Sequence, residues 1–594
     1  MNSLSISGKN WILKKYNQEE ISFFKDNFFL DEITSKLLSI RKIKKEDIKS
    51  FLNPSIKNYL PNPNILIDME KTTLRTIKAI DIKEKIGIFG DYDVDGATST
   101  ALLGKYFEEL KVPYQIYIPD RKKEGYGPTI KSFEELIHNG VKIIFTVDCG
   151  TLSFDAIEYA KKKNIDVIVL DHHQSEINLP KAFSVINPNR IDDKSNLEYL
   201  CAAGVTFMFL VSMNRELRQI DWFNKNKINE PNLINYLDLV SLGTVCDVVP
   251  LVGLNRALVK QGLKILKSKK NLGLKTLLDI CKIESTPSIY HLGFMLGPRI
   301  NAGGRVGKCS HGANLLLNSD PKDAFKLASE LDQFNKERQM LEKDLLLKLL
   351  NETKNYSKDP VLVLSGSNWH EGIIGIVAAR LKDKFNKPVI IISIEGQIGK
   401  ASARSINGFD IGSVIIAATQ GKILLKGGGH KMAGGFSINI KNIEKFKEFV
   451  FKKFRSVNED ITSEKPIYLD STLSPAAINL DFYNKVNYLA PFGSGNPEPK
   501  FLIENLKTLN GKIVGEKHIK SVLIGKDGSP IKTIAFNAVE NELGAYLLKK
   551  NSKTFNIAGK LSLNEWKGQS NVEFIIDDIS VNKTLKNTVP SSIG

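Results

Sequence analysis

The chain has 594 residues, far more than one ordinary domain, so about three or four separate cores are expected. Hydrophobic residues make up 42% and charged residues 25%, which argues against extensive disorder. The 83 Lys and Arg against 66 Asp and Glu give a net charge of +17, which favours a polyanionic partner such as nucleic acid. A Lys-rich chain also follows from AT-biased coding, so charge alone does not decide the partner.

Membrane insertion and disulfide bonding are not indicated. The N-terminus lacks an apolar signal segment, and no run of about 18 apolar residues is present. We therefore expect a soluble, cytoplasmic protein without a membrane partner. The five cysteines lie far apart with no Cys-x-x-Cys pair, so we expect them to be reduced and buried, with neither a disulfide framework nor a zinc knuckle.

Residues 1–60 predict short basic amphipathic helices. They end in a stretch rich in Pro and Asn, at Asn53–Pro54 and Pro61–Asn64, which is typical of a linker. We expect no functional site in this segment.

From Ile86 onward, short apolar runs alternate with helical periodicity. Strands are predicted at 86–89, 114–118, 141–147 and 167–170, and helices at 97–110, 130–138 and 153–163. Strand and helix repeated in this way indicate a parallel sheet with helices on both faces. The first domain is therefore predicted to be α/β.

The rest of the chain predicts a helical region, a second α/β domain and a small β-barrel. Residues 195–345 are mostly helical, and 321–351 form one long helix that joins two lobes. The second α/β domain has strands at 361–364 and 389–393, a helix at 373–385 and a glycine cluster at 427–429. The glycines could let backbone N–H groups approach a phosphate, although a run of glycines is more often a turn. Short β runs follow at 501–503, 521–524, 531–536, 555–561 and 572–576, as in an OB-type barrel that holds single strands.

Acidic residues follow three of the predicted strands. Asp91-Tyr92-Asp93-Val94-Asp95 follows strand 86–89, Asp148 ends strand 141–147, and Asp171-His172-His173 ends strand 167–170. Ligands of an open parallel sheet bind at the carboxyl ends of its strands, so these clusters should converge. Asp247, which follows a helical run, is expected at the same crevice. Converging carboxylates need cations, and oxygen ligands with imidazole suit Mn²⁺ or Mg²⁺, so we predict a two-metal site.

Simpler interpretations exist for each cluster alone. Asp-x-Asp-x-Asp-Gly also opens an EF-hand, but the twelfth position counted from Asp91 is Leu102, and a strand precedes the motif. Asp148 taken alone is more often a helix N-cap, and paired histidines can be surface residues. The conjunction of the clusters favours the metal site.

This set of motifs resembles the DHH phosphoesterase superfamily. The matching segments are Gly90–Gly96, Asp148–Gly150, Asp171–His173 with Asn187–Asn189, and Gly243–Pro250. The resemblance implies that Asp93, Asp95, Asp148, His172 and Asp247 are metal ligands, and that Asp91 and His173 are catalytic. Phe89 stands where some members carry a histidine, which makes a pyrophosphatase-like ligand set less suitable.

Further motifs are similar to the single-strand-specific exonuclease branch of that superfamily. They are Gly297–Arg305, Trp369–Gly372, Ala401–Ser405, Gly427–His430 with Gly434–Phe436, and Pro491–Pro499. The implied organisation is an N-terminal helical segment (1–60), a DHH domain (61–260), a helical linker (261–355), a DHHA1 domain (356–460) and an OB-fold domain (463–585).

A phosphate site is expected in the second lobe. Ser402 and Arg404 alternate along a predicted strand, share a face and suit a phosphate through hydroxyl and guanidinium. The resemblance implies that Arg121, Arg305, Ser402 and Arg404 hold a terminal 5′ phosphate, and that Arg299, Asn301, His370 and His430 also contact substrate.

The activity implied by the resemblance is 5′→3′ hydrolysis of single-stranded DNA with two Mn²⁺ or Mg²⁺ ions, releasing mononucleotides, in DNA repair and recombination. A monomer is expected, with a single-strand-binding protein and a helicase as accessory partners. Two rivals are a small oligoribonuclease or nucleotide phosphatase, which needs only half this length and no OB domain, and a strand-binding scaffold without catalysis, which does not need the acids at the matched positions. No Gly-Lys pair is followed by Ser or Thr, which argues against a nucleotide-driven motor.

Overall fold

The computed structural model describes residues 5–353, 359–457, 466–549, 554–566 and 569–581. Two compact units are present: one spans Pro54–Ile461 with Gly493–Gly495, and the other holds the rest of the described chain. The expected domain boundaries at 355–356, at 460–463 and at 585 lie outside the described residues. Among the described helices, none is long and apolar enough to cross a membrane.

The first sheet of the larger unit has five parallel strands in the order β3-β2-β4-β5-β6. The strands are β2 (Ile86–Gly90), β3 (Tyr114–Tyr117), β4 (Ile143–Val147), β5 (Asp166–Leu170) and β6 (Ser184–Ile186). The register pairs Gly90 with Val147 and Val147 with Leu170, so β2, β4 and β5 end level with one another. The residues that follow these three strands therefore meet at one edge of the sheet.

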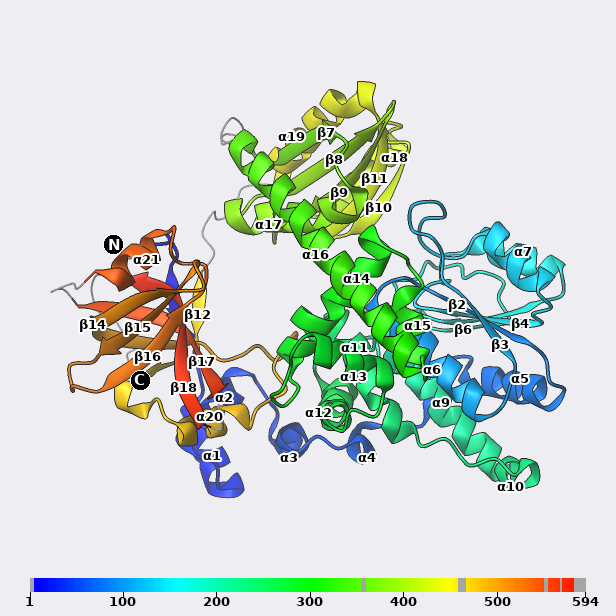
Figure 1. Cartoon of the computed structure of the whole chain (residues 1–594), viewed down its shortest axis with the longest axis horizontal. Helices are drawn as coiled ribbons and strands as arrows, with labels where there is room; N and C mark the ends of the chain where they lie inside the picture. The colour runs from blue at the N-terminus through cyan, green and yellow to red at the C-terminus, as the bar shows by residue number, and fades with distance from the viewer. Residues whose placement is uncertain (1–4, 354–358, 458–465, 550–553, 567–568, 582–594) are drawn as a thin grey trace, which may run out of the picture. The chain divides into compact units, whose positions relative to one another are not determined.

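Helices cover both faces of this sheet, as the alternating pattern predicted (Figure 1). The helices α5 (Met69–Asp81), α6 (Val94–Glu109) and α9 (Ala202–Gln219) bury one face in a large apolar core. The helices α7 (Ile130–His138) and α8 (Phe154–Lys162) bury the other face in a separate core. The sheet is apolar on both sides, which is typical of a parallel sheet.

Helices connect this sheet to the second one. They include α11 (Leu237–Cys246), α12 (Gly253–Lys267), a π-helix (His291–Leu296), α14 (Gly297–Val306) and α16 (Pro321–Glu352). α12 runs through residue 260, where a domain boundary was expected. α16 confirms the predicted long helix, and Asp320 caps its N-terminus by accepting from the backbone N–H of Lys322 and Asp323.

The second sheet has the order β10-β11-β9-β8-β7. Its strands are β7 (Leu362–Ser367), β8 (Val389–Glu395), β9 (Ile398–Arg404), β10 (Lys426–His430) and β11 (Ala433–Asn439), with α17 (Glu371–Phe385) and α18 (Ile411–Gln420) packed on it. The expected turn at 427–429 is wrong, because these glycines lie within β10. A Cβ on Gly427 would come within 2.7 Å of both Ile415 and Phe436, so this glycine permits close packing.

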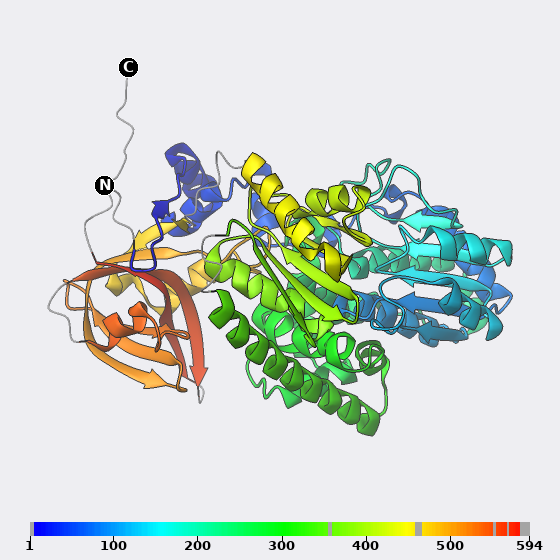
Figure 2. The ribbon, with the colours of Figure 1, turned by 90° about the horizontal axis from the view of Figure 1, so that it is seen from above.

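The smaller unit contains a closed β-barrel (Figure 2). Its strands are β14 (Phe501–Val514), β15 (His518–Ile524), β16 (Pro530–Ala535), β17 (Phe555–Trp566) and β18 (Gln569–Ser580), and pairing of β14 with β17 closes it. This confirms the predicted OB-type barrel. The N-terminal helices α1 (Gln18–Phe28) and α2 (Glu32–Ile40) join the barrel's core, and β1 (Trp11–Leu13), which was not expected, pairs with β12 (Ile467–Leu469).

Candidate active site

Three buried aspartates stand directly after the level strand ends. Asp91 follows β2, Asp148 follows β4 and Asp171 follows β5. Asp148 has φ of 60°, a left-handed conformation that is uncommon outside glycine and that accompanies functional sites. It is not a helix N-cap, because the next helix begins at Phe154 with Ser153 as its cap residue.

The start of α6 brings two more carboxylates to the same edge. Asp93 is the N-cap of α6, and its Oδ1 accepts from the backbone N–H of Asp95 at 2.9 Å and of Gly96 at 3.1 Å. The carboxylate of Asp95 accepts from Ala202 N at 2.6 Å and from Ala203 N at 2.9 Å, at the N-terminus of α9. A helix N-terminus favours the ionised form of a carboxylate. Both side chains are thus held by backbone groups.

His172 lies among the acids. Its Nε2 is 3.3 Å from Oδ1 of Asp148. The same nitrogen is 3.6 Å from Oδ2 of Asp247, the C-cap residue of α11, and 3.7 Å from Oδ2 of Asp95. The structure therefore brings residues from two strand ends and two helices to one place.

His173 is oriented by Asp171. Oδ1 of Asp171 lies 2.8 Å from Nδ1 of His173, while its Oδ2 accepts from the hydroxyl and backbone N–H of Thr151. Burial disfavours charge on both side chains, but their hydrogen bond and mutual attraction prevail. They raise the pKa of His173 to about 9 and hold the pKa of Asp171 below its usual range. Tyr126 contacts both His173 and the backbone oxygen of Asp148.

Burial and nearby negative charge disfavour ionisation of four of the acids. The pKa of Asp91 and that of Asp148 are raised well above the usual value, first by burial and then by Asp93. The pKa of Asp95 is also raised by burial. Burial, followed by repulsion from Asp95 and Asp93, raises the pKa of Asp247 to about 8. Such a cluster gains stability from bound cations.

The donor atoms fit metal ions. Oδ1 of Asp91, Oδ1 of Asp148 and Nε2 of His172 are buried without a hydrogen-bond partner among the described residues. Three groups of side chains have ligand atoms within 4.8 Å of one another: Asp91, Asp93 and Asp148; Asp95, His172 and Asp247; and Asp148, His172 and His173. The first two groups share no residue, which leaves room for two ions. We call these seven side chains the acid–histidine cluster.

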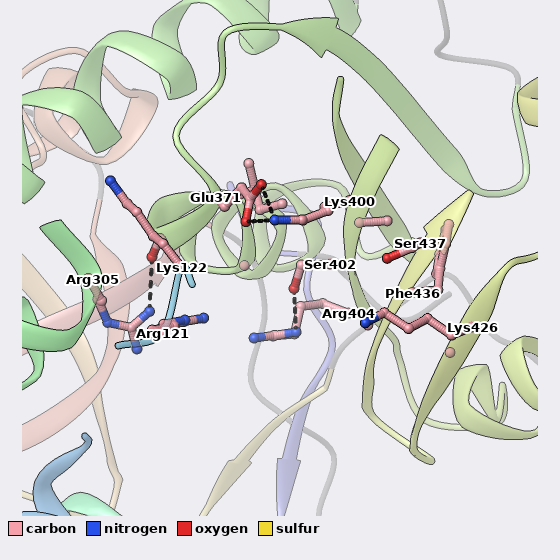
Figure 3. Close-up of a pocket in the computed structure, with 16 residues that line it drawn as sticks. Arg121, Lys122, Arg305, Glu371, Lys400, Ser402, Arg404, Lys426, Phe436 and Ser437 are labelled. Carbon is pink, nitrogen blue, oxygen red and sulfur yellow. Dashed lines mark hydrogen bonds and ion pairs between the residues drawn. The ribbon is translucent and has the colours of Figure 1, made fainter. Parts of the chain in front are cut away.

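A cavity of about 530 Å³, the cationic pocket, lies elsewhere in the larger unit (Figure 3). The charged side chains that line it are Arg121, Lys122, Arg305, Lys400, Arg404, Lys426 and Glu371. Ser402 also lines it, and its Oγ accepts from Nη1 of Arg404 at 3.0 Å. The structure therefore brings together the four residues expected at a terminal phosphate.

The guanidiniums of the cationic pocket are crowded. Burial, followed by repulsion from Arg121 and Arg338, lowers the pKa of Arg305 to about 10. Burial and Arg121 also lower the pKa of Arg404. The guanidinium of Arg121 lies 5.3 Å from the ring centre of Tyr92, the residue between Asp91 and Asp93. Arg121 therefore belongs to the end of the pocket nearest the acid–histidine cluster.

The other expected substrate contacts lie outside the lining of the cationic pocket. Arg299 donates to Asp332 of α16 at 2.8 Å, and Oδ1 of Asn301 accepts from Val94 N at the start of α6 at 3.2 Å. His370 is the N-cap of α17, and its Nδ1 accepts from Gly372 N. His430 is exposed at the end of β10.

Sequence reasoning placed Asp171 at the crevice without linking it to His173, and it assigned no role to Tyr126, Lys400, Lys426 or Ser437. The position of Asp171 two residues before His173 was the available signal, because a carboxylate commonly orients an active-site histidine. Lys400 stands two residues before Ser402 on the same strand face. No local sequence pattern indicates a functional role for Tyr126, Lys426 or Ser437.

Known proteins match this chain along most of its length. The DHH family N-terminal domain matches residues 85–244, the DHHA1 domain residues 358–456 and the RecJ OB domain residues 469–578. The single-stranded-DNA-specific exonuclease RecJ of Haemophilus influenzae is 34% identical over 543 residues, covering 89% of this chain and 93% of its own. The chain belongs to the RecJ family. The RecJ of Bacillus subtilis is 29% identical and covers 97% of this chain and 71% of its own.

Solved RecJ structures share the fold. The RecJ of Thermus thermophilus in complex with Mn²⁺ is 26% identical with a TM-score of 0.80, covering 97% of this chain and 80% of that one. A further exonuclease RecJ bound to manganese is 30% identical with a TM-score of 0.57, covering 66% of this chain and 95% of that one. Family membership confirms the predicted architecture of two α/β domains, a long helix and an OB-type barrel.

Proposed function

We propose that this chain is a metal-dependent exonuclease that hydrolyses single-stranded DNA from a 5′-phosphorylated end and releases mononucleotides. The observation that carries the proposal is the set of buried donor atoms on Asp91, Asp148 and His172 that have no hydrogen-bond partner among the described residues. Such atoms are costly unless a ligand satisfies them. The names of the RecJ relatives supply the substrate class.

Two Mn²⁺ or Mg²⁺ ions fit the acid–histidine cluster. Asp91, Asp93 and Asp148 would hold one ion, and Asp95, His172 and Asp247 the other. When bound, the ions neutralise charge on the scissile phosphate and supply an activated water. Carboxylate oxygens with imidazole nitrogen suit both metals, and the solved RecJ structures carry Mn²⁺ or Mg²⁺.

The chain's own residues position the reacting groups. Asp171 accepts from Nδ1–H of His173, which fixes the ring and leaves Nε2 to transfer a proton at the phosphate. Tyr126 donates to the backbone oxygen of Asp148 and so supports the strained residue. Asn187 donates to the backbone oxygen of His173 at 2.8 Å, which holds the loop after β5.

The cationic pocket would set the direction of digestion. Arg121, Arg305, Ser402 and Arg404 would hold a terminal 5′ phosphate, since guanidinium groups bind phosphate through two parallel hydrogen bonds. Arg299, Asn301, His370 and His430 complete the proposed substrate contacts, with Asn301 acting through the start of α6. A held 5′ end presents the first phosphodiester bond to the acid–histidine cluster, so digestion would run 5′→3′.

The smaller unit would bind the strand farther from the cut. OB-fold barrels bind single strands through basic grooves and stacking aromatics. We place the activity in the cytoplasm, in DNA repair and recombination, as a monomer working with a single-strand-binding protein and a helicase. These assignments rest on family resemblance.

Substrate choice tests the proposal directly. Purified protein is incubated with matched single-stranded DNA, double-stranded DNA and single-stranded RNA, each with Mn²⁺, with Mg²⁺ and with chelator. We expect mononucleotides from single-stranded DNA with either metal and none with chelator. Equal digestion of the duplex, or digestion in chelator, would contradict the proposal.

A further inference from the structure

The cationic pocket extends beyond the residues needed for one phosphate. Lys400 pairs with Ser437 in the register of β9 and β11, and Ser437 pairs with Lys426 in the register of β11 and β10. Residues directly opposite one another on neighbouring strands share a face. Lys400, Ser437 and Lys426 thus form one row across three strands, which we call the lysine row.

The lysine row stands beside the proposed site of the terminal phosphate. Lys400, Ser402 and Arg404 alternate along β9 on its open face, while Ala401 and Ala403 between them are buried. Two residues along a strand span roughly 6.7 Å, so the row is one step from Ser402 and two steps from Arg404. Figure 3 shows Arg404 between Arg121 and Arg305 on one side and Lys426 on the other.

Ser437 and Lys426 of the lysine row lie on the side of the pocket away from Arg121 and Arg305 (Figure 3). Arg121 stacks on Tyr92, and a Cβ on Gly304 would come within 2.9 Å of the Tyr92 ring, so Arg121 and Arg305 mark the near end. The lysine row belongs only to the second sheet. A ligand group that reached the lysine row would lie beyond the terminal 5′ phosphate, on the side opposite to the rest of the DNA strand.

The charge in the pocket exceeds what one phosphate requires. Six of its lining side chains are cationic and one, Glu371, is a carboxylate. A phosphate monoester carries roughly −1.5 to −2 at neutral pH. Glu371 is already paired with Lys400 at 2.9 Å, and no described carboxylate pairs with Lys426. The volume of about 530 Å³ is that of a pocket for a whole small ligand.

We propose that the lysine row binds the β- and γ-phosphates of a 5′-triphosphorylated strand, with the α-phosphate held by Arg404 and its neighbours. This inference rests on the proposed function, because it assumes that the cationic pocket holds the 5′ end. Lysine ammonium and serine hydroxyl groups are common phosphate contacts.

The proposal defines the first product. A water oxygen bonds to phosphorus of the first phosphodiester, the bond from that phosphorus to the 3′ oxygen of the first nucleotide breaks, and that oxygen takes a proton. The products are a nucleoside 5′-triphosphate and a shortened strand with a 5′ monophosphate. Later cuts on the same strand then release monophosphates.

Binding of matched DNA strands with three kinds of 5′ end tests the proposal. Strands with 5′-hydroxyl, 5′-monophosphate and 5′-triphosphate ends are titrated into the full chain in chelator, and the first product is identified with Mn²⁺ present. We expect the triphosphate to bind roughly tenfold more tightly than the monophosphate, and Lys426→Ala to remove most of that difference. Lys445→Ala, an exposed lysine on α19 (Ile443–Val457), is the matched control and should preserve it.

Two failures can be told apart. Equal binding of hydroxyl and monophosphate ends would overturn the terminal-phosphate pocket, and the proposed direction of digestion with it. A preference for monophosphate over hydroxyl, without a further gain for triphosphate, would overturn only the lysine row. A gain that survives Lys426→Ala, or a first product other than the nucleoside triphosphate, would do the same.

Discussion

In the acid–histidine cluster, Asp91, Asp148 and His172 follow the ends of adjacent strands, whereas Arg121, Arg305 and Arg404 of the cationic pocket come from a loop, a helix and a strand far apart in sequence. Both regions crowd like charges. Burial raises the pKa of Asp148 and lowers the pKa of Arg404, so each region is completed by a ligand of opposite charge. Asp93 and Asp95 are held by backbone groups, while the arginines sit on long side chains.

This difference predicts how each region responds to substitution. A short side chain fixed at a strand end has no neighbour that can replace it, so its substitution should remove nearly all activity. Where several long cationic side chains hold one phosphate, each single substitution should remove only part of the binding affinity.

The largest effect is expected in the acid–histidine cluster. Asp148→Ala should lower the hydrolysis rate by roughly a thousandfold or more, because an oxygen shared by two potential ligand groups is lost. DNA binding should change little. Rates and binding are compared with Asp155→Ala, an exposed acid on α8. Hydrolysis by Asp148→Ala at the unsubstituted rate would remove Asp148 from the site.

Arg404→Ala should act on specificity. Loss of a charge-assisted phosphate contact should reduce the preference for a 5′-phosphate over a 5′-hydroxyl end roughly ten- to a hundredfold. The preference is measured as a ratio of kcat/KM values, with Arg218→Ala, an exposed arginine on α9, as control. An equal fall on both ends, together with a lower Tm, would mean that Arg404 is structural.

Asp171→Asn tests whether this carboxylate positions His173. The amide cannot stabilise a charged imidazole, so the pKa of His173, about 9, should fall toward its usual 6.5. Activity should fall roughly ten- to a hundredfold. Histidine NMR titration of the metal-free chain reads the pKa, and an unchanged pKa would show that Asp171 does not control His173.

Removal of the smaller unit should lower the affinity for DNA by an amount that depends on strand length. Its N-terminal helices share the core of the barrel, so residues 1–53 and 462–594 must be removed together. Affinity for long single strands should fall roughly tenfold, with less change in turnover of very short ones, because stacking contacts add along a strand. Equal loss at all lengths would mean that this unit supports folding instead.

The smallest effect is a dependence of stability on pH in the metal-free chain. The pKa of Asp247 is raised to about 8, so its ionisation destabilises the fold as pH rises from its usual 3.8. The His173 contribution is complete below pH 6.5 and is lost as pH rises through about 9. The Tm should therefore fall over this range, and Mn²⁺ should raise it more at high pH. A rise in Tm with Mn²⁺ that is the same at every pH would contradict this prediction.

The sequence predicts one region better than the other for a physical reason. Parallel strands end at a common edge, so the acids after β2, β4 and β5 could be placed without knowing the packing of any helix. Asp247 was expected there too, but its position depends on how α11 packs beside α6 and α9.

The cationic pocket depends on register and long-range packing. Sequence alone sets no register for the glycine-rich β10 and β11, so Lys426 could not be placed opposite Ser437. The partner of Arg299, Asp332, lies 33 residues away, and no local pattern predicts that ion pair. Pairing of β1 with β12 joins residues 11–13 to residues 467–469, and no local sequence pattern predicts it.

The most direct test of the central claim is the order in which the ends of a single strand are released. A 5′-phosphorylated DNA strand is labelled near its 5′ end or near its 3′ end and digested with Mn²⁺ in a time course. The account predicts that the 5′ label appears at once in mononucleotides, while the 3′ label stays in a ladder of shortening strands. Early release of the 3′ label would contradict it.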